Sequence, residues 1–239
     1  MTIDRNFWFS HKSEVIATIL SDAAYNGDGW ALVCIDTDRP ESDVRLATMQ
    51  IGPILAMLDV FFTQASSVGR MFLHARSATT RSVGIAYNHD FTDGNGTLIM
   101  HNGVIANGAM LAVDSFNLGM NIPVEDADYL LTQLRTTGET FANVFLIHPE
   151  QATYSVVRLT TGRLYSDGKG NYSTNSMAGI KSLVPEFTAE YNYLDGYVPK
   201  KFKESTSSDF YLGDWSDVFP LDQSVLDDDL IDYRAKWSK

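Results

Sequence analysis

The order of its apolar runs constrains the fold of this chain more than any other feature. Helical spacing of apolar residues is found in four segments: 13–25, 53–64, 107–119 and 126–138. Short β-type runs are found in five: 30–36, 71–75, 97–101, 141–148 and 153–165. The glycine-rich stretch DFTDGNGT between the second and third of these runs predicts a hairpin-type turn. The order of the segments predicts an α+β fold in which helices cover sheets.

Composition narrows the class of protein. The chain has 239 residues, 44% of them hydrophobic, enough for a sizeable core. A formal net charge of −12 argues against a nucleic-acid partner, because such binding depends on Lys and Arg neutralising phosphates. Cys34 is the single cysteine, so a reducing compartment is expected, and its mid-strand position predicts inert core. Without a signal peptide or a run of about 18 apolar residues, the chain is expected to be cytoplasmic and to make no membrane contact.

The C-terminal part differs in composition from the rest. We expect one domain over 1–200 and a separate acidic, aromatic-containing segment over 201–239. Residues 204–233 contain nine acidic side chains and no basic one, interleaved with apolar residues such as Trp215 and Phe219. Two interpretations stay open. The segment lies across the domain on its apolar side chains, or it is a docking arm for a basic partner surface or a charge mimic of a nucleic acid.

Several common catalytic motifs are missing from the sequence. There is no nucleophile elbow of the form G-x-S-x-G, no phosphate-binding P-loop and no H-E-x-x-H motif. The five histidines are scattered, without the close pairing typical of zinc ligands. Neither a metal site nor another cofactor is therefore expected.

Three motifs together carry a resemblance to a known family. The stretches HARSATT, NHDF and HNGVIAN, which begin at His74, Asn88 and His101, resemble motifs of the class II glutamine amidotransferase domain. EDADYLL, YNGDGWALVCID and the strand region from 141 to 176 are similar to further parts of that domain. The resemblance covers roughly 1–185, and as a set the motifs are specific.

The resemblance implies a fold and a set of site residues. The implied fold is the four-layer αββα sandwich of the N-terminal-nucleophile hydrolases. The implied oxyanion hole is Asn102 with Gly103, where a side-chain amide and a backbone N–H converge on the developing charge. The implied binding residues for glutamine are Arg76 for the α-carboxylate, Asp126 for the α-ammonium and Thr79 in the pocket wall. His74 and His101 are expected to brace the two loops by hydrogen bonds.

The chain departs from the family pattern close to the reacting centre. Where the family begins M-C-G-I, this chain begins MTID, so Thr2 falls where the nucleophilic cysteine belongs. A threonine hydroxyl depends wholly on a base to take its proton, and that base would be the free α-amine left after Met1 is removed. Ile3 replaces a glycine, Ser77 replaces an aromatic residue, and Arg81 replaces a small one.

Two functions follow from the matches and the departures. In the first, the chain is a glutaminase or an amidotransferase subunit that hydrolyses glutamine through Thr2 and supplies ammonia to a separate synthase. In the second, it is an inactive protein of the same fold, a binding or regulatory module that engages a partner through its retired pocket or acidic tail. In both, the expected small ligand is glutamine or a related amino acid or amide.

Overall fold

The structure is a computed structural model, and it describes residues 1–77, 84, 88, 91–92, 96–103, 141–149, 153–160, 163–183, 187–192 and 200–201. The chain divides into two compact units, Met1–Ser205 and Thr206–Lys239. The description below concerns the first unit. The helices expected at 107–119 and 126–138 lie outside the described residues, as does the acidic tail beyond 201.

Within the described residues, the fold is α+β, with helices α1 (Arg5–Tyr25) and α2 (Ile51–Gln64) and two antiparallel sheets. The first sheet has seven strands in the order β11 (Ser182–Leu183), β9 (Tyr165–Ser166), β10 (Tyr172–Ser173), β1 (Thr2–Asp4), β4 (Arg70–Ala75), β2 (Trp30–Ile35) and β3 (Val44–Thr48). The second has six in the order β13 (Lys200–Lys201), β12 (Phe187–Asn192), β8 (Thr153–Thr160), β7 (Phe141–His148), β6 (Leu98–Gly103) and β5 (Phe91–Thr92). A short 3₁₀ helix, Pro40–Ser42, precedes β3.

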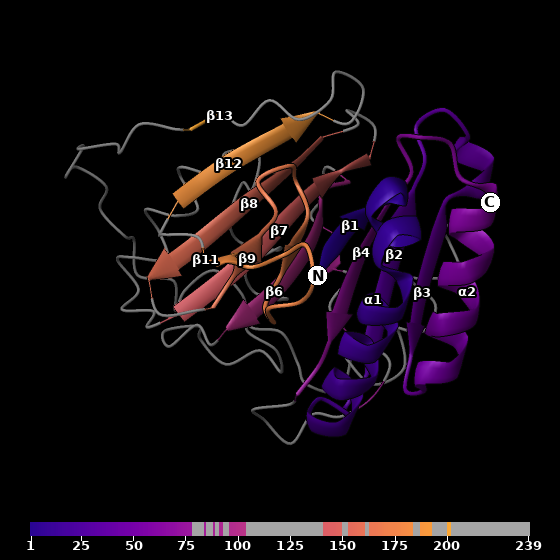
Figure 1. The fold of residues 1–239 in the computed structure, drawn as a ribbon, viewed down its shortest axis with the longest axis horizontal. Coiled ribbons are helices and arrows are strands. Elements are labelled where there is room, and N and C mark those ends of the chain that lie inside the picture. The colour runs from indigo at the N-terminus through magenta and orange to yellow at the C-terminus, as the bar shows by residue number, and fades with distance from the viewer. Residues whose placement is uncertain are drawn as a thin grey trace, which may run out of the picture. The chain divides into compact units, whose positions relative to one another are not determined.

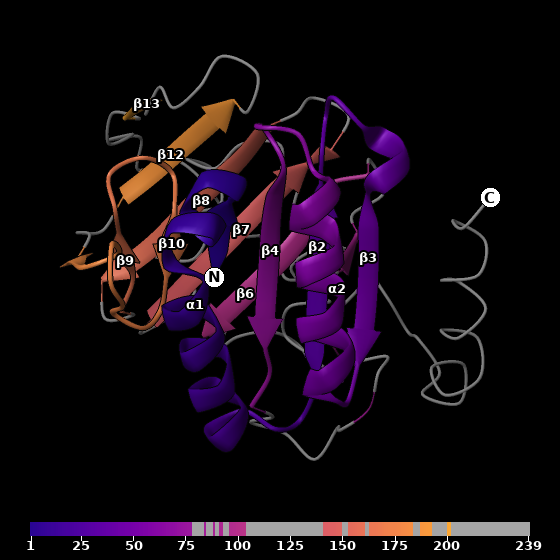
Figure 2. The same cartoon turned by 45° about the vertical axis from the view of Figure 1, so that its right-hand side comes forward.

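The two helices lie on one face of the seven-stranded sheet. Figures 1 and 2 show α1 and α2 side by side over β4, β2 and β3, with the second sheet on the other side of these strands. The helix-side core is formed by alternate strand residues and both helices, with Trp8, Phe62 and Trp30 among its largest members. These side chains are apolar and almost fully buried, so they hold the helices on the sheet through the hydrophobic effect.

The opposite residues of the same strands build a second core between the two sheets. Val33 and Phe72 of the first sheet pack there with Met100, Phe145 and Tyr154 of the second. The alternation along β2 shows the division, because Leu32 belongs to the helix-side core and Val33 to the inter-sheet core. A strand buried on both faces needs a continuous apolar run, which WALVCI provides.

The structure differs from the expected elements in three places. The helix expected over 13–25 is the second stretch of α1, which follows a kink at His11, and a first stretch begins at Arg5, because the Asp4 carboxylate accepts a hydrogen bond from the Phe7 N–H at 2.8 Å and caps that earlier start. The strand expected over 153–165 is two strands, β8 and β9, which lie in different sheets. The strand β3 was not expected at all, because its residues are only half-buried and its alternation is weak.

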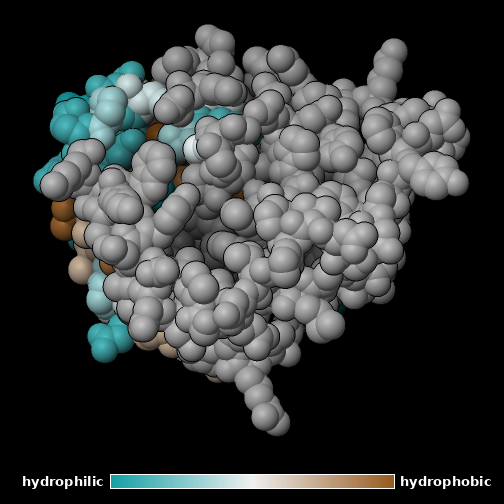
Figure 3. Space-filling model, turned by 180° about the vertical axis from the view of Figure 1, so that it is seen from behind, coloured by the Kyte–Doolittle hydropathy of each residue, from teal (hydrophilic) through white to brown (hydrophobic). Residues whose placement is uncertain are grey.

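The apolar side chains of this unit are mostly enclosed between its layers. Among the described residues, the large hydrophobic side chains that are exposed are few: Phe9, Leu20, Tyr25, Val60 and Leu183. Seen from behind, the described surface along one edge is largely hydrophilic, with a smaller apolar strip beside it (Figure 3). No helix in the described part of the chain is both long and apolar enough to cross a membrane.

Candidate functional site

The amino terminus of the chain is held inside the fold. The Met1 α-amine donates a hydrogen bond to the Leu73 carbonyl at 2.8 Å, and the Leu73 N–H donates to the Met1 carbonyl at 2.8 Å. Met1 therefore continues the pairing of β1 with β4 by one residue beyond the strand. This pairing fixes the position of the α-amine, which an unpaired terminus would not do.

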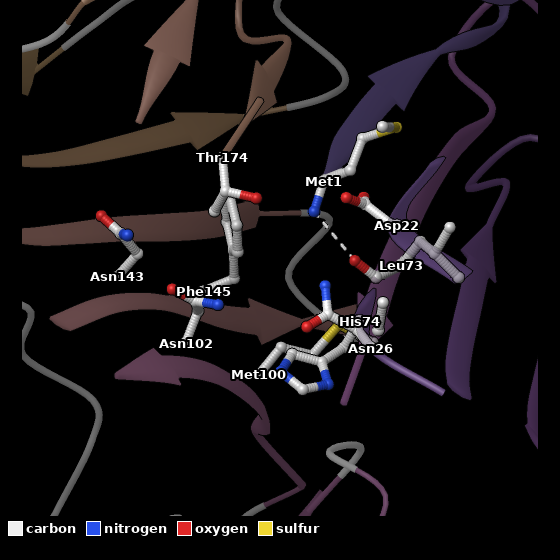
Figure 4. Close-up of a pocket in the computed structure, with 11 residues that line it drawn as sticks. Met1, Asp22, Asn26, Leu73, His74, Met100, Asn102, Asn143, Phe145 and Thr174 are labelled. Atoms are coloured by element: carbon white, nitrogen blue, oxygen red, sulfur yellow. Dashed lines mark hydrogen bonds between the residues drawn. The ribbon is translucent and has the colours of Figure 1, made fainter. Parts of the chain in front are cut away.

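The α-amine lies in a pocket between the two sheets and the end of α1. Figure 4 shows the Met1 nitrogen beside Asp22 and above His74, while the Met1 side chain runs away from the pocket. That side chain packs against the helix-side core. The pocket walls come from β4, β6, β7, α1 and the residue after β10, and the lining residues are Met1, Asp22, Asn26, Leu73, His74, Ala75, Met100, Asn102, Asn143, Phe145 and Thr174.

Burial changes the acid–base behaviour of the amine. It lowers the pKa of the Met1 α-amine from 8.0 to about 6, and the neighbouring Asp22 carboxylate opposes that shift. Burial also raises the pKa of Asp22, whereas the amine and a hydrogen bond from the Asn175 side chain lower it. Burial therefore favours the unprotonated amine, whose lone pair can accept a proton.

Asn102 is the predicted oxyanion donor that lies in this pocket. It is at the end of β6, directly opposite Asn143 of β7 in the sheet register. Asn102 is exposed, so its carboxamide is accessible from the pocket mouth. The next residue, Gly103, has a φ of +154°, a conformation that other residues rarely adopt. The structure thus brings the first residue of the chain and the predicted oxyanion donor into one pocket.

Thr2 lies one residue further along the strand and does not line the pocket. Its side chain is fully buried, and its hydroxyl donates to the Met71 carbonyl at 2.8 Å. The Arg70 guanidinium donates a hydrogen bond to the same hydroxyl at 3.4 Å. With Met1 present, the residue that faces the pocket is Met1. The thioether of methionine is no nucleophile for acyl transfer.

A buried polar cluster holds β1 in place behind the pocket. Arg70 donates to the Gly170 carbonyl at 2.8 Å, and its guanidinium lies 5.2 Å from the centre of the Tyr154 ring. It also forms an ion pair with Asp4 at 3.5 Å. Asn171 donates to the same carboxylate at 3.2 Å and accepts a hydrogen bond from the Asp4 N–H at 2.8 Å. The cluster ties β1 to β4 and to the turn before β10.

Arg76 is close to the pocket in sequence but is not part of its lining. Its side chain is 4% exposed and is engaged in other interactions. Its N–H donates to the Gly29 carbonyl at 2.8 Å, and the Asp28 N–H donates to the Arg76 carbonyl at 3.1 Å. These bonds join the end of β4 to the turn before β2. The α-carboxylate role of Arg76 stays a prediction.

The two histidines occupy different environments. His74 lines the pocket, with 9% of its surface exposed, whereas His101 is fully buried and does not line it. Both make interactions with the protein, but the bracing role expected for them stays a prediction. The remaining predicted site residues, Thr79 and Asp126, lie outside the described residues.

Several pocket residues were not foreseen from the sequence. Asn143 is 2% exposed in the mainly apolar strand FANVFLIH, and Asp22 and Asn26 come from the end of α1. An asparagine at an inward-facing strand position is the kind of signal that could have identified Asn143. Asp22 gives no such signal, because an acidic residue on an amphipathic helix reads as part of its solvated face.

The described residues contain no group of three or more His, Cys, Asp or Glu side chains that could hold a metal ion. Cys34 is free and buried in β2, and burial raises the pKa of its thiol well above the ordinary value. The chain matches no protein-family model and no curated protein. The chemistry of the pocket is therefore argued from its own residues.

Proposed function

We propose that this chain is a cytoplasmic class II glutamine amidotransferase-like protein that hydrolyses the side-chain amide of glutamine once Met1 has been removed. The observation that carries the proposal is the buried α-amine of the first residue, held in one pocket with Asn102. A free N-terminal amine is the base that an N-terminal nucleophile needs, and a side-chain amide is a donor for the oxyanion. The proposal includes the four-layer αββα arrangement, with the helices expected at 107–119 and 126–138 as the fourth layer.

Removal of Met1 would convert Thr2 into the first residue of the chain. Met1 lines the pocket and directly precedes Thr2 in the chain, so their Cα atoms are about 3.8 Å apart. Loss of Met1 would free the space that it occupies and would leave the α-amine and the hydroxyl on the same residue. The buried cluster around Arg70 and Asp4 would hold the β1 main chain in place, and the Thr2 hydroxyl, which donates to the Met71 carbonyl while Met1 is present, would turn into the space that Met1 leaves.

The reaction then proceeds in two steps. The Thr2 hydroxyl oxygen attacks the amide carbon while the α-amine takes the hydroxyl proton, and Asn102 with the Gly103 N–H stabilises the oxyanion. Collapse of the tetrahedral intermediate breaks the C–N bond, and the protonated amine returns its proton to the leaving group, so that ammonia leaves. A water molecule then hydrolyses the ester by the same base, giving glutamate and restoring Thr2. The ammonia would pass to a separate synthase.

The test separates the removal of Met1 from the hydrolysis of glutamine. Intact mass first shows whether purified protein retains Met1, and co-expression with a methionine aminopeptidase, which acts before the terminus is enclosed, then provides a sample without it. We expect ammonia release from glutamine only in the sample that lacks Met1. Thr2→Ala should abolish the release and leave the fold intact, and Thr2→Cys should raise it, because a thiol is partly ionised near neutrality. A Met1-free protein that is inactive as both threonine and cysteine would contradict hydrolysis.

A second candidate function is supported by the state of Thr2 with Met1 present. Its hydroxyl is fully buried and bonded to the Met71 carbonyl, and the pocket is lined by Met1 and not by Thr2. In that state the chain would act as a binding or regulatory module that engages a partner through the pocket or the acidic tail. Calorimetric binding of glutamine to protein that retains Met1, without ammonia release, would favour this second function over the first.

A further inference from the structure

Two carboxamide side chains line the pocket from neighbouring strands. Asn102 of β6 lies directly opposite Asn143 of β7 in the register, and directly opposite residues of an antiparallel pair project from the same face of a sheet. That face is the one turned toward the inter-sheet core, because Met100 and Phe145, two positions along the same strands, belong to this core. Figure 4 shows both asparagines across the pocket from Met1.

The carboxamide of Asn143 has an acceptor that the described residues leave unused. The side chain is 2% exposed, and its nitrogen donates to the Arg163 carbonyl at 3.4 Å. Its oxygen is buried and has no hydrogen-bond partner among the described residues. A buried acceptor without a partner lowers stability, so native proteins contain few of them and each calls for an explanation. Because Asn143 lines the pocket, the N–H group of a bound ligand can supply the missing donor.

Together the two asparagines match the hydrogen-bonding groups of a primary carboxamide. Such a group has a carbonyl oxygen, which accepts hydrogen bonds, and an NH₂, which donates them. The Asn102 amide is the proposed donor to the carbonyl oxygen, and the Asn143 oxygen is an acceptor for the NH₂. An ester has the same carbonyl oxygen but no N–H, so it would leave the Asn143 oxygen unpaired. The pocket volume of about 50 Å³ suits a small polar group of this kind.

Asp22 is a second acceptor in the pocket wall, but it is already engaged. Its carboxylate accepts a hydrogen bond from the Asn175 side chain and lies beside the Met1 amine (Figure 4). Its negative charge disfavours a carboxylate ligand whatever Asn143 does, so glutamate is an unsuitable comparison for glutamine. The γ-methyl ester of glutamate is the better comparison, because its side chain is neutral and differs from that of glutamine by OCH₃ in place of NH₂.

We infer that Asn143 is a specificity-determining residue of this site, which accepts a hydrogen bond from the side-chain NH₂ of glutamine and so selects a primary carboxamide over an ester. The inference rests on the proposed function for the identity of the ligand as glutamine. It adds the residue that recognises the group which leaves as ammonia.

Binding tests the inference without requiring catalysis. L-Glutamine and L-glutamate γ-methyl ester are titrated by calorimetry into full-length, Met1-free Thr2→Ala protein, which lacks the proposed nucleophile and so turns neither ligand over. We expect glutamine to bind at least about tenfold more tightly than the ester. Asn143→Leu, which keeps the approximate size of the side chain and removes its acceptor, should bring the two affinities within about twofold of each other. The comparison of ratios cancels the effect of the additional methyl group of the ester.

Two controls distinguish recognition from a general disturbance of the strand. Val144→Ala is the matched control, since Val144 is the next residue of β7, is fully buried and is not among the described residues that line the pocket. It should leave the ratio of affinities unchanged even if stability falls. Asp22→Ala should leave the ratio unchanged as well. If Asn143→Leu does not fold, Asn143→Ala removes the same acceptor with a smaller side chain and is compared in its place.

The outcomes separate the inference from the proposed function. The inference is wrong if the Thr2→Ala protein binds both ligands equally or binds neither, if Asn143→Leu keeps the preference, or if Asp22→Ala removes it. Ammonia release from glutamine is measured separately on Met1-free protein that retains Thr2. A preference that depends on Asn143, without ammonia release, would uphold the inference and contradict hydrolysis. Ammonia release together with a ratio that Asn143→Leu does not change would do the reverse.

Discussion

The turn before β2 requires glycine at position 29. The φ of Gly29 is +145°, and a Cβ atom built on it would lie 1.9 Å from the Asn88 side-chain oxygen. Asn88 is fully buried and donates to the carbonyls of Trp30 and Thr48, each at 3.1 Å. The same turn binds the main chain of Arg76. A side chain at Gly29 would therefore disturb three segments at once.

Gly29→Ala is accordingly expected to lower the free energy of unfolding by about 2–3 kcal/mol. Gly52→Ala is the matched control, because Gly52 lies in α2 with nothing within 4 Å of a built Cβ. It should be neutral or stabilising by up to about 1 kcal/mol. Urea unfolding of the two variants measures the difference. Equal stability of both variants would contradict the steric argument.

The α-amine of Met1 gives the protein a pH-dependent stability. Its pKa is about 6 when folded and 8.0 as the ordinary value, so between these pH values the unfolded chain binds more protons. The free energy of unfolding should therefore rise by at most about 2.7 kcal/mol as the pH increases from 6 to 8. Below pH 6 this gain should be absent, because the folded protein then binds the proton as well. Urea unfolding across this range measures the rise.

Asp22→Asn tests the cause of that dependence. The Asp22 carboxylate raises the pKa of the amine against the effect of burial, so its loss should lower that pKa further. The pH window of rising stability should then extend to lower pH. An extension to higher pH, or a flat profile in the unmodified protein, would show that the amine is not enclosed as described.

At the scale of elements, β1 depends on the buried cluster around Arg70. The strand has only three residues, too few to be secured by its own ladder, and Asp4 at its end also caps α1. The contacts of Arg70 with Gly170, Asp4 and Tyr154 therefore position both the strand and the pocket floor.

Arg70→Met should lower the free energy of unfolding by about 3–5 kcal/mol, because it leaves the half-buried Asp4 carboxylate without its cation. Lys12→Met is the control at an exposed ion pair, in which Lys12 and Asp59 are 43% and 57% exposed. Its effect should stay below about 1 kcal/mol. Denaturant unfolding compares the two variants. A loss at Arg70 no larger than the loss at Lys12 would mean that the cluster does not hold β1.

For the whole molecule, the division into Met1–Ser205 and Thr206–Lys239 predicts that the first unit folds without the second. A chain ending at Ser205 should unfold cooperatively, with a free energy within about 1 kcal/mol of that of the full chain. Circular dichroism during urea unfolding measures it. A fragment that aggregates or loses cooperativity would instead favour the interpretation in which the acidic segment lies across the domain.

The periodicity of the sequence determined most elements of the described fold. Apolar spacing located α2, β2, β4, β6 and β7, because a run buried on one or both faces has to be apolar at the positions that face a core. It missed β3, whose residues are half-buried, and it missed the first stretch of α1 before the kink at His11, since the cap at Asp4 lies outside the apolar stripe. Apolar spacing could not predict the division into β8 and β9, because periodicity does not show which sheet a strand joins.

The sequence by itself also determined that Asn102 and Gly103 lie at the end of a strand. Only the tertiary structure decided which residue faces the pocket. Thr2 and Met1 are neighbours in the chain, but the register of β1 against β4 turns the Thr2 hydroxyl to the Met71 carbonyl and leaves the Met1 amine in the pocket. The contributions of Asp22, Asn26 and Asn143 were likewise decided by packing, because segments far apart in the chain meet there through long-range sheet pairing that no local pattern encodes.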